Sequence, residues 1–220
     1  MDAVAGKVLN RKSMKLNGTE RIKPIETIYN GYRFRSRLEA RWAVFFDSLN
    51  VEYEYEPEGY DLGERRYYLP DFRVQCYGKR GDKKLTPFEL WIEVKGEMTE
   101  RDAEKIYLFA GHYDNRIYMG KYIIDNPVLI VGGIPKKGMA FDAYSIHAYE
   151  RMNGINIFPF NYYTIDGDNY AAYPTADKEG RFYLTGSDYF NSKEMEITEN
   201  AYREARQARF EHLNALMEDV

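Results

Sequence analysis

The stretch from Tyr67 to Gly96, which begins YYLPDFRV and ends FELWIEVKG, decides the fold that we expect for this chain. In FELWIEVKG apolar residues alternate with mostly polar ones, and this period of two predicts a strand with one apolar face. The apolar positions are Phe88, Leu90, Ile92 and Val94. The other positions are Glu89, Trp91, Glu93 and Lys95. Glu93 and Lys95 are therefore expected to point the same way.

The segment YYLPDFRV is rich in β-forming residues and is predicted to be the partner strand. Pro70 suits an edge or a bulge, which leaves Asp71 where the ladder of hydrogen bonds is interrupted. The intervening CYGKRGDKKLTP carries two glycines and a proline, as expected of a hairpin connection longer than a tight turn. Pairing the two strands would bring Asp71 beside Glu93 and Lys95.

Two carboxylates that converge on one point favour a cation between them, because the buried pair is otherwise costly. Oxygen ligands without a nearby His or Cys favour a hard ion, Mg²⁺ or Mn²⁺, over zinc. Mg²⁺ readily takes a phosphate oxygen as a further ligand, and a neighbouring lysine can orient an attacking water or, as the free amine, deprotonate it. The pattern is typical of phosphodiester hydrolysis.

Pro70-Asp71, followed after a hairpin by Glu93-Val94-Lys95 in an apolar strand, resembles the motif of the PD-(D/E)XK nuclease superfamily. That superfamily includes restriction endonucleases, archaeal-type Holliday-junction resolvases, the endonuclease subunit of Tn7-like transposition and many phage nucleases. The resemblance implies an α/β, restriction-endonuclease-like core with the order helix, three antiparallel strands, helix, strand. It also implies DNA as partner, Mg²⁺ as cofactor with Mn²⁺ able to substitute, and the cytoplasm of a bacterium or phage-infected cell.

The same resemblance implies roles for individual residues. Asp71, Glu93 and the backbone carbonyl of Val94 would bind the principal Mg²⁺. Glu39, on the first core helix, would hold a second ion directly or through water. Lys95 would position and activate the nucleophilic water.

The other expected core elements can be followed along the chain. SRLEARWAVFFDSLN carries an apolar stripe at helical spacing, and Ser36 with Glu39 forms a capping box, so Glu39 has the alternative role of satisfying the helix N-terminus. An alternating strand follows from Val51. Thr99 with Asp102 is a helix start signal, and the apolar run after Pro127 predicts a buried strand.

Arginines gather before and within the first helix, and those expected to contact nucleic acid are Arg33, Arg35, Arg37 and Arg41. Asn30-Gly31 predicts a tight hairpin, on whose second strand Arg33 and Arg35 would share a face. Backbone phosphate is one interpretation of that face, and an ordinary exposed hairpin is the other.

Three regions are expected along the chain. Residues 1–24 form a flexible basic arm, either solvated or in contact with DNA; residues 25–133 form the nuclease core with its N-terminal hairpin; residues 134–220 form a β-rich elaboration and a terminal helix. The aromatic residues of 134–190 are expected to pack a small added sheet on the core, with base stacking as the alternative, and a short helix is expected near 140–152. The terminal helix, predicted through SKEMEITENAYREARQARFEHLNALMED, either packs on the domain or forms a homodimer contact.

Bulk composition excludes several classes of protein. Of 220 residues, 44% are hydrophobic and 30% charged, as in an ordinary globular chain. The single Cys76 excludes an intramolecular disulfide, the three His form no zinc pattern, and no apolar run predicts a membrane span. The net charge is −4, but residues 1–50 hold ten Lys and Arg against five acids, so a basic front end precedes an acidic body.

The function expected is a metal-dependent nuclease acting on DNA, an endonuclease of a phage or mobile element. Two alternatives stay open. One is a ribonuclease of the same fold, since nothing in the sequence encodes discrimination against the 2′-hydroxyl. The other is a non-catalytic module that binds nucleic acid or protein and retains the nuclease fold.

Overall fold

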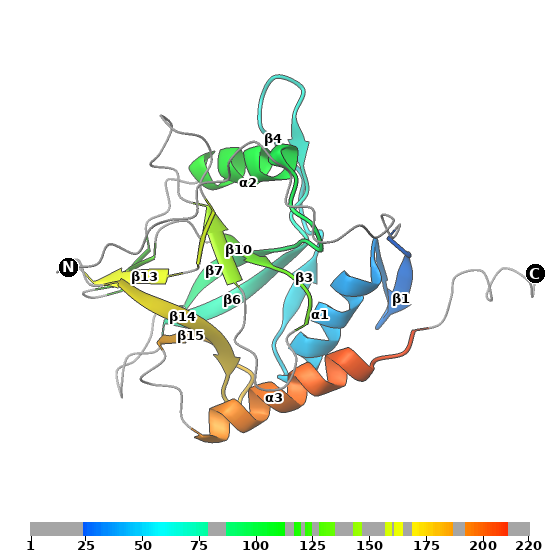
Figure 1. Ribbon diagram of the computed structural model, residues 1–220, viewed down its shortest axis with the longest axis vertical. Helices are drawn as coiled ribbons and strands as arrows, with labels where there is room; N and C mark the ends of the chain where they lie inside the picture. Colours follow the sequence, from blue (N-terminus) through cyan, green and yellow to red (C-terminus); the bar gives the residue numbers. More distant parts are fainter. Residues whose placement is uncertain are drawn as a thin grey trace, which may run out of the picture.

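The fold is a curled, mixed β-sheet with helices on both faces (Figure 1). This computed structural model describes residues 24–78, 87–112, 117–119, 122–124, 128–134, 143–146, 157–159, 161–164, 169–186 and 192–210. The helices in these residues are α1 (Arg37–Ser48), α2 (Glu100–His112) and α3 (Ser192–Gln207). Helix α2 covers one face of the sheet, and α1 and α3 lie together on the other. The α/β class is therefore confirmed. The expected basic arm falls outside these residues, apart from Pro24.

The sheet of eleven strands runs in the order β12-β11-β10-β7-β6-β15-β14-β13-β9-β8, and β3 pairs with β6 off this path. Its first strands are β3 (Tyr53–Tyr55), β6 (Phe72–Gly78), β7 (Pro87–Val94), β8 (Ile117–Met119), β9 (Tyr122–Ile124) and β10 (Val128–Val131). The later ones are β11 (Ala143–Ile146), β12 (Ile157–Pro159), β13 (Asn161–Thr164), β14 (Asn169–Ala176) and β15 (Phe182–Gly186). Two small hairpins stand apart: β1 (Thr27–Tyr29) with β2 (Tyr32–Phe34), and β4 (Tyr60–Asp61) with β5 (Tyr67–Tyr68).

The central pair is β6 and β7, which run antiparallel with Phe72 opposite Ile92. On the other edge of β7, the parallel strand β10 has all four residues buried, as expected after Pro127. The prediction that YYLPDFRV is one strand is wrong, because Tyr67–Tyr68 pairs with β4 instead and β6 begins only at Phe72. Pro70, which lacks a backbone N–H, separates the two strands and leaves Asp71 at the break.

Strand β7 is buried on both faces toward its C-terminal end. Leu90 and Ile92 pack in the layer under α1, while Trp91 packs against Phe109 of α2 with ring centroids 5.5 Å apart. The sequence predicted one apolar face, and the structure shows that the other face is buried as well, because a second helix covers the side that carries Trp91 and Glu93. Glu93 is 2% exposed as a result.

Local start and turn signals in the sequence are confirmed. Ser36 caps α1 by accepting the Glu39 backbone N–H, and the Thr99 hydroxyl accepts the Asp102 N–H at the start of α2. Asn30 and Gly31 join β1 to β2 with φ values of 47° and 80°, the positive values that a tight primed turn requires.

The region after α2 departs from expectation in several ways. The segment before Pro127 contains the hairpin β8–β9, and Ala143–Ile146 is a strand where a short helix was expected. The later strands join the central sheet itself, because β15 pairs in parallel with β6, rather than forming a separate added sheet. Helix α3 ends at Gln207, so the expectation of helix throughout is wrong for 208–210, and residues 211–220 lie outside the described part.

Helix α3 packs on α1, which agrees with the first alternative for the C-terminal helix, packing on the domain. Ala201, Tyr202 and Ala205 are buried in the main core, and the ring of Tyr202 stacks on Phe45 at 4.6 Å. A homodimer contact remains a prediction.

The turn between β14 and β15 docks against the end of α1 through a glycine. Gly180 has a φ of 77°, and a Cβ at this position would lie 2.0 Å from the carbonyl oxygen of Asn50. We expect Gly180→Ala to lower the free energy of unfolding by about 2 kcal/mol or more, because the left-handed backbone and the clash add. Urea denaturation measures this change.

Gly63→Ala is the matched control, since Gly63 has a φ of 79° and a Cβ at this position would meet no atom within 4 Å. Its free energy of unfolding should fall by only about 1 kcal/mol, the part that comes from the left-handed backbone conformation. Equal losses in the two variants would show that the contact with Asn50 does not constrain the turn.

Candidate active site

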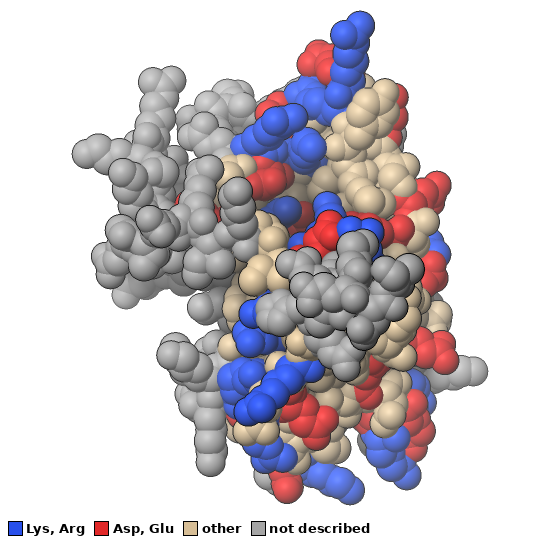
Figure 2. Space-filling view, turned by 90° about the vertical axis from the view of Figure 1, so that its right-hand side faces the viewer, with Lys and Arg blue, Asp and Glu red and all other residues tan. Residues whose placement is uncertain are grey.

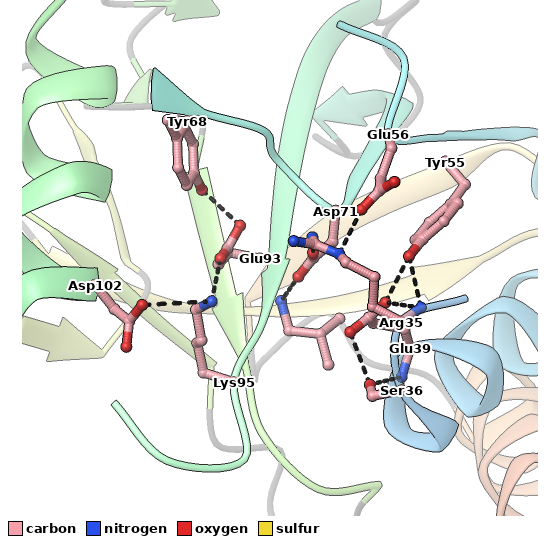
Figure 3. Close-up of polar contacts among 11 residues, drawn as sticks. Arg35, Ser36, Glu39, Tyr55, Glu56, Tyr68, Asp71, Glu93, Lys95 and Asp102 are labelled. Carbon is pink, nitrogen blue, oxygen red and sulfur yellow. Dashed lines mark hydrogen bonds and ion pairs between the residues drawn. The ribbon is translucent and has the colours of Figure 1, made fainter. Parts of the chain in front are cut away.

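Three acidic residues from separate elements lie buried around the break between β5 and β6 (Figure 3). Asp71 precedes β6, Glu93 lies near the end of β7, and Glu39 lies in the first turn of α1. Their exposed fractions are 1%, 2% and 7%. Buried carboxylates need hydrogen-bond donors or cations, so the partners of each one define what the site can do.

Asp71 uses its two oxygens differently. Oδ2 accepts the backbone N–H of Val94 at 2.7 Å, which fixes the carboxylate against the end of β7. Oδ1 accepts the guanidinium Nη2 of Arg35 at 2.5 Å. Arg35 also forms an ion pair with Glu56, so it bridges two carboxylates. The pairing of β6 with β7 thus brings Asp71 to Glu93-Val94-Lys95, as the sequence predicts.

Glu93 is held by one donor on each oxygen. The Tyr68 hydroxyl donates to Oε2 at 2.6 Å, and the Lys95 ammonium lies 2.6 Å from Oε1. Lys95 Nζ also lies 3.8 Å from Oδ1 of Asp102, whose other oxygen accepts the Thr99 backbone N–H at the start of α2. Glu93 and Lys95 therefore face the same side, as predicted, and the carboxylate is oriented by a phenol and an ammonium.

Glu39 serves the start of α1. Its Oε1 accepts the Ser36 hydroxyl at 2.7 Å, and its Oε2 accepts the Tyr55 hydroxyl at 2.6 Å and the Arg35 backbone N–H at 3.1 Å. The capping alternative for Glu39 is confirmed. Contact of Glu39 with a second metal ion remains a prediction.

The charges of the three carboxylates act on one another. Burial, followed by the charges of Glu93 and Glu39, raises the pKa of Asp71 well above its usual range, although the Val94 N–H and Arg35 oppose this shift. Burial alone would lower the pKa of Lys95, but Glu93 and then Asp71 outweigh it and the pKa of Lys95 is raised. Burial and the Glu93 charge likewise raise the pKa of Tyr68. Lys95 is therefore a cation at neutral pH in this arrangement.

The donor set suits a hard divalent ion. Within the part of the chain that the structure describes, no group of three or more His, Cys, Asp or Glu side chains that could hold a metal is found. The arrangement instead offers Asp71 and Glu93, each neutralised by an organic cation. Mg²⁺ commonly uses one or two carboxylates and completes its shell with water, so two carboxylate ligands satisfy it without a third.

The four arginines predicted to contact nucleic acid do not gather at one point. Arg35 reaches Asp71, whereas Arg33 forms an ion pair with Glu26. Arg37 and Arg41 lie half-buried on α1, and Nε of Arg41 is buried without a hydrogen-bond partner. On the face shown in Figure 2, Lys and Arg are interspersed with Asp and Glu rather than forming one basic surface.

Sequence reasoning missed several residues that hold the site. Tyr68 donates to Glu93, and Tyr55 donates to Glu39. Glu56 pairs with Arg35. The sequence identifies Asp102, which lies near Lys95, only as part of a helix start signal. The tyrosines carry no motif, and their spacing indicates only strand alternation. The pairing of β3 with β6 and the break at Pro70 are what bring them to the carboxylates.

Comparison of the chain with protein-family models, with curated proteins and with solved structures found no match. No helix in the described ranges is long and apolar enough to cross a lipid bilayer.

Proposed function

We propose that this protein is a metal-dependent nuclease of the PD-(D/E)XK type that hydrolyses phosphodiester bonds in DNA, an endonuclease of a phage or mobile element. One observation carries the proposal: buried Asp71 and Glu93 extend from neighbouring strands, and Lys95 lies against Glu93. The elements α1, β3, β6, β7, α2 and β10 support it: once the hairpins β4–β5 and β8–β9 are set aside, they run helix, three antiparallel strands, helix, strand.

Asp71 Oδ1, Glu93 and the backbone carbonyl of Val94 are the groups that would hold Mg²⁺ or Mn²⁺. When bound, the ion supplies a Lewis acid for the phosphoryl oxygen and lowers the pKa of a coordinated water. Glu39 would act through water, since Ser36, Tyr55 and Arg35 already occupy its oxygens. Tyr68 keeps Glu93 oriented toward the same side as Lys95.

Lys95 acts in this scheme as a hydrogen-bond donor rather than as a proton acceptor. Its raised pKa leaves it protonated at neutral pH, so it can orient an attacking water or stabilise negative charge on the phosphate. Because Asp102 and Glu93 lie on two sides of the ammonium, its position is restricted before substrate binds.

The test is a cleavage panel with purified full-length protein. Linear, nicked, branched and single-stranded DNA and matching RNA are incubated with Mg²⁺, Mn²⁺ or EDTA, and products are resolved on denaturing gels. Internal cleavage of DNA that EDTA abolishes supports the proposal. Cleavage of RNA alone would favour the ribonuclease, and absence of cleavage and of metal binding would favour a binding module.

A further inference from the structure

Each oxygen of Asp71 already accepts one hydrogen bond, and the donor at Oδ1 is Arg35. Oδ2 is taken by the Val94 N–H at 2.7 Å, which belongs to the backbone and cannot swing aside. Oδ1 contacts Nη2 of Arg35 at 2.5 Å. Oδ1 is therefore the oxygen that an ion can gain by displacing one side chain, and that side chain is Arg35.

The two partners of this contact differ in their freedom to move. The Asp71 side chain is 2% exposed, whereas the Arg35 side chain is 52% exposed. Arg35 also contacts Glu56, whose side chain is 23% exposed, so the guanidinium has a second carboxylate nearer the surface. If Arg35 moves away from Asp71, the guanidinium is therefore still paired with Glu56 and partly hydrated, while Asp71 stays in place.

Charge balance explains why a cation sits there. A carboxylate buried beside two others is costly unless it is neutralised, and Arg35 is the cation on Asp71 as Lys95 is on Glu93. A divalent ion at Asp71 would supply that charge and make the guanidinium redundant. Cation and guanidinium are both positive and would share one oxygen, so they repel each other and compete for it.

We propose that Arg35 competes with the divalent cation for Oδ1 of Asp71 and moves off this oxygen when the ion binds. The inference rests on the proposed metal site. It assigns Arg35 a role distinct from simple phosphate contact: the guanidinium stabilises the metal-free protein and lowers its affinity for metal. Once displaced, the half-exposed Arg35 side chain keeps its charge beside the site, where it can attract an anionic substrate.

Isothermal titration with Mn²⁺ tests the competition. Arg35→Met, which keeps the apolar stem and removes the competing charge, should bind Mn²⁺ about tenfold more tightly than wild type, since a charge-assisted hydrogen bond no longer has to be broken. The matched control is Arg181→Met, because Arg181 is equally exposed at 52% and also contacts an Asp and a Glu, Asp177 and Glu179. Its Mn²⁺ affinity should equal that of wild type.

The outcomes separate the inference from the proposed function. Equal or weaker Mn²⁺ binding by Arg35→Met, with wild-type binding that Asp71→Asn abolishes, overturns the competition and leaves the metal site standing. Absence of Asp71-dependent binding in both wild type and Arg35→Met overturns the metal site itself.

A second measurement uses the wild-type protein and does not depend on the folding of Arg35→Met. In ¹⁵N NMR, Mg²⁺ should shift the Arg35 Nε–Hε resonance together with the Val94 amide, which reports on Asp71 through their hydrogen bond. Arg35→Lys identifies the Arg35 resonance. A shift of Val94 without any change at Arg35 would overturn the inference.

Discussion

Lys95→Met is expected to lower the rate of Mg²⁺-dependent DNA cleavage about 10³-fold while the protein stays folded. The ammonium lies 2.6 Å from Glu93 and is held in place by Asp102, so its loss removes a positioned donor that no described neighbour replaces. Methionine keeps most of the apolar stem, and Tyr68 still donates to Glu93. Single-turnover cleavage and thermal unfolding measure the two effects separately.

Lys178→Met is the control, since Lys178 lies in the exposed turn after β14 with its side chain 80% exposed. It should cleave as fast as wild type. Cleavage by Lys95→Met within threefold of wild type would remove Lys95 from the mechanism. A loss of cleavage accompanied by unfolding would instead assign Lys95 a structural role on the buried Glu93.

Asp71 requires a more conservative change than Lys95. Alanine would leave the Val94 N–H without its acceptor. It would also remove one of the two described ion-pair partners of Arg35, leaving Glu56. A loss of activity in Asp71→Ala could therefore come from a loss of stability. Asparagine keeps an oxygen for Val94 and removes the charge.

Local signals in the sequence predicted the elements because the physics that produces them is local. Ser36 and Thr99 cap helices through their own next turn, and Asn30-Gly31 supplies positive φ values by itself. The pairing of β6 with β7 follows from a hairpin, so the proximity of Asp71 and Glu93 was also predictable.

Features that depend on distant segments were not predictable in this way. Alternation identified β7 as a strand but did not show that α2 would bury Trp91 and Glu93. Nothing in the sequence of β15 names β6 as its neighbour, because backbone hydrogen bonds do not depend on side-chain identity. The contact of Arg35 with Asp71, 36 positions apart, arises only once Phe34, at the end of the first hairpin, packs on Phe72 at the start of β6.

Divalent metal is expected to stabilise the protein more as the pH rises through the range in which folded Asp71 loses its proton. The pKa of Asp71 in the metal-free fold is raised by burial and by the charges of Glu93 and Glu39, whereas an unfolded Asp titrates near pH 4. Between these two values the folded state binds more protons than the unfolded state. The free energy of unfolding of the metal-free protein therefore falls as the pH rises through this window. The pKa values of Lys95 and Tyr68 are raised from ordinary values near 10, so these two groups change the stability only at pH values above this window.

Metal binding has the opposite dependence, because the ion requires the ionised carboxylate and competes with its proton. At the alkaline end of this range, with Mg²⁺ at about 100 times its Kd, the gain is about 3 kcal/mol, which raises the Tm of a chain of this size by roughly 5–10 °C. At the acidic end of this range the gain should be clearly smaller. Differential scanning calorimetry with Mg²⁺ or EDTA at each pH measures both values, and Asp71→Asn should abolish the gain and its pH dependence together. A stability gain that survives in Asp71→Asn would mean that the ion binds elsewhere. A gain that shrinks as the pH rises would mean the same, because a carboxylate ligand binds a cation more tightly as it loses its proton.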